Sequence, residues 1–181
     1  MILGPLTGLR ARLPEDVPVL HGELYEDVAT RSRADSRPWR PLSPAGGHSP
    51  YEPSAPAEDA ALFSVVDRAT GELAGEALLW GIDTHNRCAH LGISLRPGCR
   101  GRGFGAEVVQ LLCHYGFTVR GLQRLQVDTL ADNTAMTGAA RRAGFVLEGT
   151  LRGSAWVSGA FADEVILGLR AAEWNRPDWQ D

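Results

Sequence analysis

The chain has 181 residues, of which 44% are hydrophobic, and 18 basic and 22 acidic side chains give it a formal net charge of -4. This length and composition indicate one folded domain spanning residues 1–181 and exclude global disorder. The acidic balance argues against a general nucleic-acid binder, whose affinity would depend on neutralising phosphates.

The cysteines Cys88, Cys99 and Cys113 are odd in number, form no C-x-x-C motif and show no metal-ligand spacing with the five histidines. This pattern is typical of reduced thiols and indicates no metal site. The opening "MILGPLTGLRARLPED" lacks the apolar core of a signal peptide, and no apolar run approaches the roughly 20 residues of a membrane helix. We therefore expect a cytoplasmic protein with no membrane partner.

The first third of the chain predicts a strand, a helical region and a long loop. Residues 6–13 alternate imperfectly and predict a strand, whereas residues 14–33 carry apolar side chains at helical spacing and predict one helix or two. Residues 34–60 contain six prolines and no periodicity, so they predict a loop. Its large side chains, Trp39 and Tyr51, should either pack back on the domain or line a substrate mouth.

From residue 61 onward the pattern changes to short strands and two helices. The predicted strands cover 61–67, 72–82, 87–95, 124–130, 145–157 and 160–169, and the predicted helices cover about 104–119 and the segment from Asn133, an N-cap, to Gly144. Short turns join the first three of these strands and predict an antiparallel meander. A helical crossover joins 87–95 to 124–130, so these two strands should be parallel. The fold class is therefore α+β, with one mixed, mostly antiparallel sheet.

The segment "RPGCRGRGFGAEVVQLL" (96–112) places three glycines directly before a predicted helix. Backbone N–H groups at a helix N-terminus lack intrahelical partners and favour anions. Glycines there let the backbone approach a ligand closely, and Arg100 and Arg102 add donors that suit phosphate. The segment predicts a cradle for a phosphate or pyrophosphate.

Three further roles for these glycines fit the sequence less well. A turn with a close helix–sheet contact would account for one glycine better than for three that alternate with arginine and phenylalanine. Gly101, Gly103 and Ala106 satisfy the G-x-G-x-x-A fingerprint of dinucleotide oxidoreductases, but five residues separate them from the strand and the preceding strands form a meander. A P-loop is excluded because no G-K-S/T follows.

Three segments together resemble the GNAT superfamily of acyl-CoA N-acyltransferases. "RGRGFG" (100–105) resembles its motif A, Q/R-x-x-G-x-G/A. "DNTAMTGAARRAGFVLEGTLR" (132–152) and "GAFADEVILGLRAAEW" (159–174) resemble blocks of the Rim-like branch, which acetylates protein N-terminal amines. Three motifs in the right order are much more specific than any one of them.

The resemblance implies a single GNAT-like domain with helices on both faces of the sheet and a splayed parallel strand pair. Acetyl-CoA would lie in the splay as co-substrate, and a primary amine would attack it directly, without an acyl-enzyme or a metal. The cofactor-binding candidates are Ile93, Leu95, Arg100, Gly101, Arg102, Gly103, Phe104, Gly105 and Asn133. Ile93 and Leu95 would offer backbone N–H groups to the pantetheine amides and the thioester carbonyl.

His90 and Ser94 are the catalytic candidates because they share one face of strand 87–95. Many relatives carry Glu at the position of His90, where it takes the proton of the amine, and an imidazole can do this at neutral pH. The alternative is that His90 is a half-buried strand residue without a catalytic part. Ser94, closer to the thioester, would bind a water or the substrate.

Two departures from the family pattern support a second hypothesis. The tyrosine that commonly protonates the leaving thiolate is replaced by Ala140 or Arg141, and Met136 stands where the Rim-like branch commonly has Ser. The chain could therefore be a non-catalytic acyl-CoA-binding or sensing domain. The amine acceptor stays open between a small molecule and a peptide, loop 34–60 is the expected acceptor-site loop, and a homodimer is not settled by any sequence feature.

Overall fold

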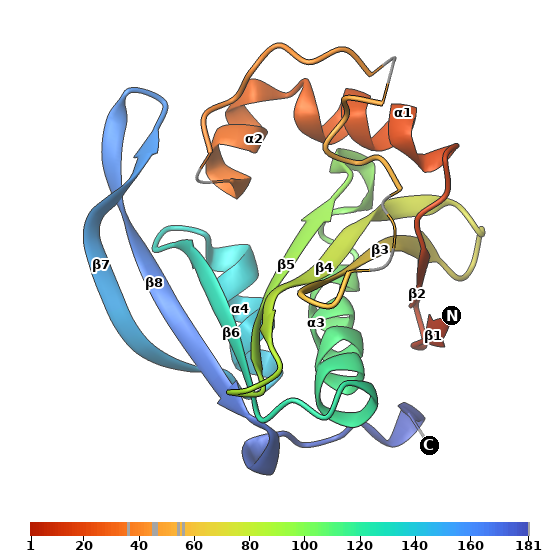
Figure 1. The fold of residues 1–181 in the computed structure, drawn as a ribbon, viewed down its shortest axis with the longest axis vertical. Coiled ribbons are helices and arrows are strands. Elements are labelled where there is room, and N and C mark those ends of the chain that lie inside the picture. The colour runs from red at the N-terminus through yellow and green to blue at the C-terminus, as the bar shows by residue number, and fades with distance from the viewer. Residues whose placement is uncertain (36, 45–46, 54, 56, 181) are drawn as a thin grey trace.

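The computed structural model describes residues 1–35, 37–44, 47–53, 55 and 57–180, through which one twisted sheet runs (Figure 1). Its strands lie in the order β1-β2-β3-β4-β5-β6-β8-β7. Neighbours are antiparallel except β5 and β6, which are parallel as predicted. The strands are β1 (Ile2–Leu3), β2 (Thr7–Ala11), β3 (Ala60–Asp67), β4 (Leu73–Asp83), β5 (Cys88–Leu95), β6 (Arg124–Leu130), β7 (Val146–Val157) and β8 (Ala160–Arg170).

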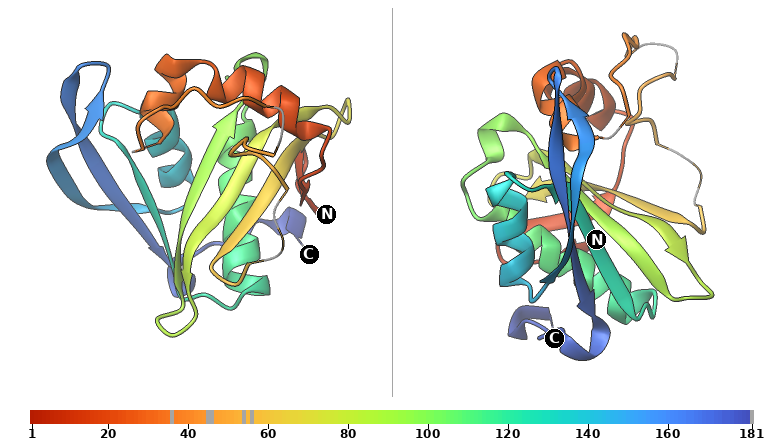
Figure 2. Two further views of the ribbon diagram at one scale, coloured as in Figure 1. Left: turned by 45° about the horizontal axis from the view of Figure 1, so that its top comes forward. Right: turned by 90° about the vertical axis from the view of Figure 1, so that its left-hand side faces the viewer.

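Helices cover both faces of this sheet, which confirms the predicted α+β class (Figure 2). The α-helices are α1 (Asp16–Leu20), α2 (Val28–Ala34), α3 (Phe104–His114) and α4 (Thr134–Arg142). The π-helical turns η1 (His21–Tyr25) and η3 (Tyr115–Val119) extend α1 and α3, and 3₁₀ turns lie at η2 (Pro97–Cys99), η4 (Ala171–Glu173) and η5 (Asp178–Gln180). No helix within the described ranges combines the length and the apolar character needed to cross a lipid bilayer.

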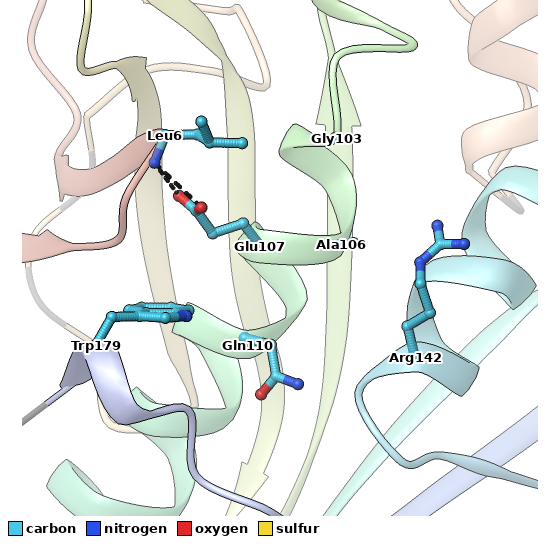
Figure 3. A pocket seen from close by; sticks show the side chains of 7 residues that line it. All are labelled: Leu6, Gly103, Ala106, Glu107, Gln110, Arg142 and Trp179. Atoms are coloured by element: carbon cyan, nitrogen blue, oxygen red, sulfur yellow. Dashed lines mark hydrogen bonds between the residues drawn. The ribbon is translucent and has the colours of Figure 1, made fainter.

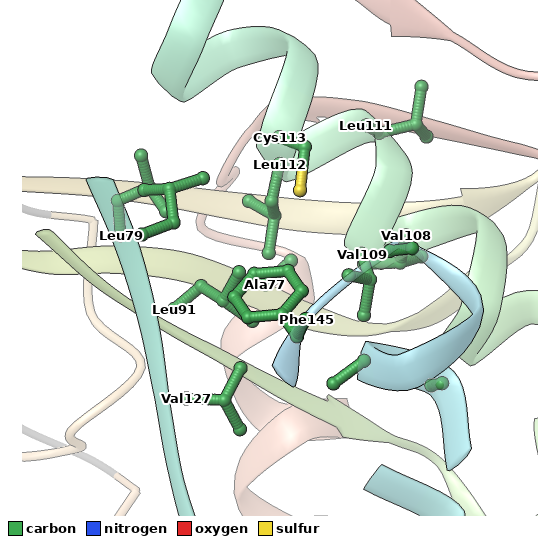
Figure 4. Close-up of a cluster of buried hydrophobic side chains, with 14 of the residues drawn as sticks. Ala77, Leu79, Leu91, Val108, Val109, Leu111, Leu112, Cys113, Val127 and Phe145 are labelled. Atoms are coloured by element: carbon green, nitrogen blue, oxygen red, sulfur yellow. The ribbon is translucent and has the colours of Figure 1, made fainter. Parts of the chain in front are cut away.

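The main core lies between the sheet and the α3–α4 face (Figure 4). Val108, Leu111 and Leu112 of α3 are fully buried, as their helical spacing predicts. Tyr115 lies in the π-turn that follows, is half-buried and meets Phe63 edge-on at 5.0 Å. This core fixes α3 against β4 and β5, so the start of α3 has a defined position beside the end of β5.

The predicted helical region 14–33 is two helices rather than one. The first ends after η1, and Asp27 then caps α2 by accepting a hydrogen bond from the Thr30 N–H at 3.1 Å. Asp27 has a non-helical backbone, which is typical of an N-cap and breaks the helix at this point.

The first predicted strand, 6–13, is shorter than expected and has an unexpected partner. Its ordered pairing covers Thr7–Ala11, and β1 pairs with it through a tight turn in which the Gly4 N–H donates to Thr7 O at 2.8 Å. A two-residue strand is too short to leave a periodic signal in the sequence.

Trp39 and Tyr51 of the proline-rich segment pack back on the domain, one of the two alternatives left open by the sequence. Tyr51 is 2% exposed and joins Leu20, Leu24 and Tyr25 in a second small core. The Trp39 indole donates to the Tyr25 carbonyl at 3.0 Å. Loop 34–60 is therefore attached to α1 and η1, although residues 36, 45–46, 54 and 56 of this predicted loop lie outside the described residues.

Asp16 at the start of α1 joins three elements through buried hydrogen bonds. Its carboxylate accepts from both terminal nitrogens of Arg10, at 2.6 and 2.7 Å, from the Ser64 hydroxyl at 2.7 Å and from the Leu13 N–H at 2.9 Å. Burial raises the pKa of Asp16, but these donors outweigh it and hold the pKa at about 2. A carboxyl whose pKa is lower in the folded chain than in the unfolded chain stabilises the fold when ionised.

Asp16→Asn should therefore lower the free energy of unfolding by about 2 kcal/mol at pH 7. The contribution of Asp16 is fully present above its unfolded pKa and is lost as pH falls toward 2, so the deficit should shrink by about half at pH 3. Urea unfolding of both proteins at the two pH values measures this difference. Glu15→Gln, an exposed neighbour, serves as the control and should change the free energy by less than about 0.5 kcal/mol. An Asp16→Asn deficit that does not depend on pH would contradict the assignment.

Candidate functional site

The parallel strands β5 and β6 separate soon after they begin. Only three residue pairs join them, Cys88 with Arg124, Ala89 with Leu125 and His90 with Gln126. Beyond His90, β5 stays paired with β4 and β6 stays paired with β8, so the two strands diverge as a fork (Figure 1). The splayed strand pair expected from the sequence is thus present, and it begins at a residue predicted as catalytic.

The fork leaves one edge of β5 without a strand partner. The Arg96 N–H, just past β5, points toward β4 and donates to the Ala74 carbonyl at 2.9 Å. Because successive residues of an extended chain point their N–H groups to opposite sides, those of Leu95 and Ile93 point toward the fork. The backbone N–H groups of these two predicted residues therefore face the space between the strands, while their side chains pack on the main core.

The glycine segment forms a loop with several unpartnered backbone donors. Among the described residues, none accepts a hydrogen bond from the backbone N–H groups of residues 101–106, and the first bond of α3 runs from the Glu107 N–H to Gly103 O. Gly101 and Gly103 have φ values of 74° and 84°, which other residues rarely adopt. A Cβ on Gly101 would meet nothing within 4 Å, so the loop is open on that side.

The arginines and Phe104 of this loop contact other parts of the chain. Arg102 donates to the Asp67 carboxylate at 2.7 Å and lies 4.4 Å above the Phe104 ring, and Arg100 donates to Leu95 O at 3.1 Å. Phe104 is buried, with its ring between the core and the Arg102 guanidinium, whereas Gly105 continues the helix. The arginines brace the loop and still keep further guanidinium donors.

A pocket of about 260 Å³ continues from the glycine loop along α3 (Figure 3). Gly103 of the glycine loop and Ala106 and Gln110 of α3 line it, with Arg142 from α4 and Trp179 from the C-terminal segment. The sequence singled out neither Trp179 nor Gln110, since nothing in the pattern brings the end of the chain to α3. In the structure, Trp174 anchors that segment by donating its indole N–H to Gln110 at 2.8 Å.

His90 lies at the base of the fork in a defined polar contact. Its Nδ1 is 2.5 Å from an oxygen of Asp128 on β6, and its ring stacks on Trp80 of β4 with centroids 4.1 Å apart. Burial raises the pKa of Asp128, but hydrogen bonds from His90 and Gln126 bring it below its ordinary value. Sequence reasoning missed Asp128, and the available signal was the polar alternation of Arg124, Gln126 and Asp128 along one face of β6.

Ser94 lies on the same face of β5 as His90, but the two side chains are far apart. The two residues are four positions apart, about 13 Å along the strand. Ser94 instead lies beside its register partner Glu76, whose carboxylate forms a buried ion pair with Arg12 at 2.8 Å. Burial raises the pKa of Glu76 despite this cation. Ser94 and His90 therefore cannot contact the same ligand atom.

Asn133 caps α4 with its side-chain oxygen and contacts β6 with its side-chain amide. Its oxygen accepts from the Met136 N–H at 3.1 Å, and its amide donates to the Thr129 hydroxyl at 3.0 Å. This confirms the predicted N-cap. Among the residues that the structure describes, no group of three or more His, Cys, Asp or Glu side chains is arranged to hold a metal ion.

The site therefore combines a fork of parallel strands with a helix whose first backbone N–H groups have no partner among the described residues. The family follows from the sequence: a model described as "Acetyltransferase (GNAT) domain" matches residues 7–146. The chain therefore belongs to the GNAT acetyltransferase family, as its motifs predicted.

Individual relatives agree with this family. The chain is 31% identical over 112 residues to an uncharacterized N-acetyltransferase of Bacillus licheniformis, covering 62% of this chain and 63% of the relative. It is 29% identical over 105 residues to a putative ribosomal N-acetyltransferase of Bacillus subtilis, covering 58% and 57%, which agrees with the Rim-like branch. The chain thus spans about 60% of the length of the curated relatives it matches.

A solved structure supports the fold as a whole. Spermidine N-acetyltransferase from Vibrio cholerae, in complex with CoA and spermine, superposes with a TM-score of 0.77 at 20% identity and covers 94% of this chain and 98% of that one. At this identity the likeness establishes the fold and not the ligands.

Asn133→Ala should lower the free energy of unfolding by about 1 kcal/mol, because the cap of α4 is lost. Asn133→Asp keeps an equally good cap, so its free energy of unfolding should fall less. The difference between the two variants measures the contribution of the capping hydrogen bond. Urea unfolding at pH 7 measures both. Equal losses in the two variants would show that the contact to Thr129, and not the cap, stabilises this helix.

Proposed function

We propose that this chain is an N-acetyltransferase that moves an acetyl group from acetyl-CoA to a primary amine. This proposal depends mainly on two features that lie side by side. They are the fork after His90 and the unpartnered N–H groups of residues 101–106. The family supports the reaction class, and the geometry supports the binding of one end of the thioester carrier at each of these two features.

The glycine loop would hold the pyrophosphate of coenzyme A. Backbone donors at the start of α3 and the partial positive charge of the helix end favour an anion there. Arg100 and Arg102 would add charge from their remaining donors. The pocket that runs from Gly103 to Arg142 offers room for the rest of the nucleotide, and Asn133 borders the opposite arm of the fork.

The unpaired edge of β5 would hold the pantetheine arm and the thioester. Acetyl-CoA supplies the activated acetyl group, and the N–H of Ile93 or Leu95 would stabilise the charge that develops on the carbonyl oxygen. Main-chain donors suit this task because the sheet already holds them in place before the ligand binds. Ser94, on the other face of β5, would contact the acceptor or a water molecule.

His90 would accept the proton that an ammonium group must lose before it can attack. It lies at the base of the fork, its side chain is 31% exposed, and no described residue makes a hydrogen bond to its Nε2. The position of the family tyrosine that protonates the departing thiolate is taken here by Ala140, which is fully buried, or by Arg141. The thiolate would therefore take its proton from water.

The acceptor class is an amine, and the relatives suggest two kinds. One is named a spermidine acetyltransferase and another a putative ribosomal acetyltransferase. Loop 34–60 would shape the acceptor site, since its Trp39 and Tyr51 attach it to α1 and η1 on the His90 face of the sheet. Because the buried Ala140 cannot protonate the leaving thiolate, a second function is a domain that binds acyl-CoA without turnover.

An amine panel with acetyl-CoA tests the proposed function. The panel holds spermidine, a peptide with a free N-terminus and the same peptide with a blocked N-terminus. Amine-dependent release of free CoA, with a product heavier by one acetyl group, is the expected result. Tight binding of acetyl-CoA without release under any amine would support the sensing domain instead.

Gly103→Val should weaken CoA binding at least about tenfold while the protein stays folded. A residue with a Cβ disfavours the left-handed backbone of Gly103 by about 1–2 kcal/mol, so the loop should rearrange and its donors should no longer converge. Calorimetric titration with CoA measures the affinity, and thermal unfolding measures the fold.

Gly159→Val is the matched control for this strain. Gly159 has a φ of 88° in the turn between β7 and β8, and a Cβ there would meet nothing within 4 Å. Both variants should lose comparable stability, but only Gly103→Val should lose affinity. Unchanged CoA binding by Gly103→Val would rule out the glycine loop as the anion site.

A further inference from the structure

Asp128 and His90 come from different strands and meet where those strands separate. Asp128 lies two residues beyond Gln126, the last β6 residue paired with β5, so it shares a face with Gln126 and with His90. Its side chain spans the widening gap and reaches His90 Nδ1 at 2.5 Å. We propose that Asp128 is the positioning residue of His90, holding the imidazole as the Nδ1–H tautomer with Nε2 available to accept a proton.

The tautomer follows from the chemistry of the contact. An ionised carboxylate only accepts hydrogen bonds, so the proton in the contact must belong to Nδ1. The lowered pKa of Asp128 keeps this carboxylate ionised at neutral pH. In a neutral imidazole that carries its proton on Nδ1, the Nε2 atom has a free lone pair.

The Asp128 carboxylate is itself held in place by a row of hydrogen bonds along β6. Its second oxygen accepts from the Gln126 amide at 2.8 Å, and the Gln126 oxygen accepts from Arg124 at 3.1 Å. Arg124 forms an ion pair with Glu148 on β7. This row leaves Asp128 little freedom to turn away from His90.

Trp80 restricts the ring from its flat side. The indole is a register partner of His90 on β4 and lies at an interplanar angle of 20° to the imidazole. The ring is therefore fixed by one contact in its plane, from Asp128, and by one contact on its face. A fixed ring with a single free nitrogen is suited to repeated proton acceptance, which a freely rotating histidine would perform less efficiently.

The tautomer itself can be measured without any reaction. Nitrogen-15 NMR of the ring nitrogens in the wild-type chain should show His90 with Nδ1 protonated and Nε2 bare, with His90→Gln used to assign the signals. In Asp128→Asn the side-chain amide can donate as well as accept, so this preference should be lost. A bare Nδ1 in the wild-type chain, or an unchanged tautomer in Asp128→Asn, would overturn the proposal.

The catalytic consequence rests on the proposed function and needs a double-mutant cycle. Asp128→Asn should lower kcat by roughly 10- to 100-fold with little change in the KM for acetyl-CoA, within the range that general base catalysis contributes. In a His90→Ala background the same change should lower kcat less than about twofold, because Asp128 acts only through His90. Equal losses in both backgrounds would show a structural role and overturn the positioning role.

Glu72→Gln is the matched control for the loss of one carboxylate. Glu72 is exposed in the turn between β3 and β4, and its side chain makes no hydrogen bond to a described residue. Its kcat should equal that of the wild type. If no amine accelerates CoA release, the proposed function fails while the NMR result still decides whether Asp128 sets the His90 tautomer.

Discussion

The separation of β5 from β6 after three residue pairs is the constraint on which the rest of the structure depends. A parallel sheet that stayed closed would satisfy its own backbone groups and leave none for a ligand. Each backbone group left without a partner in a dry place costs about 1–3 kcal/mol, so a fork persists only when packing elsewhere enforces it. Here the main core fixes β5 through α3. β6 pairs with β8 along the whole length of β6, which keeps β6 apart from β5.

The same packing fixes the glycine loop beside the fork. Phe104 is buried and anchors the first turn of α3, and Arg102 ties the loop to Asp67 at the end of β3. Glu107 accepts hydrogen bonds from Leu6 and Thr7, which attaches the N-terminal segment to the same helix. The donors of the loop are therefore held in place by the packing of the chain itself, as the proposed binding of an anion by backbone groups requires.

Periodicity predicted most of the elements because each one buries a single face. In β5, for example, Ala89 and Leu91 alternate with His90 and are buried on the core side of the strand, as a period of two requires. Two features lack such a periodic signal. β1 is too short to carry a pattern, and the C-terminal segment folds against α3 and η3 through Trp174, whose contacts with Gln110, His114 and Phe117 follow no sequence period.

The sequence by itself determined the family, the order of the strands and helices after residue 60, the cap at Asn133 and the glycine loop, because each depends on residues close together in the chain. Only the tertiary structure decided the pairing of His90 with Asp128, which lie 38 residues apart. That contact depends on the register of two parallel strands and on the point where they part. Both are set by the packing of α3 and β8, which no local pattern encodes.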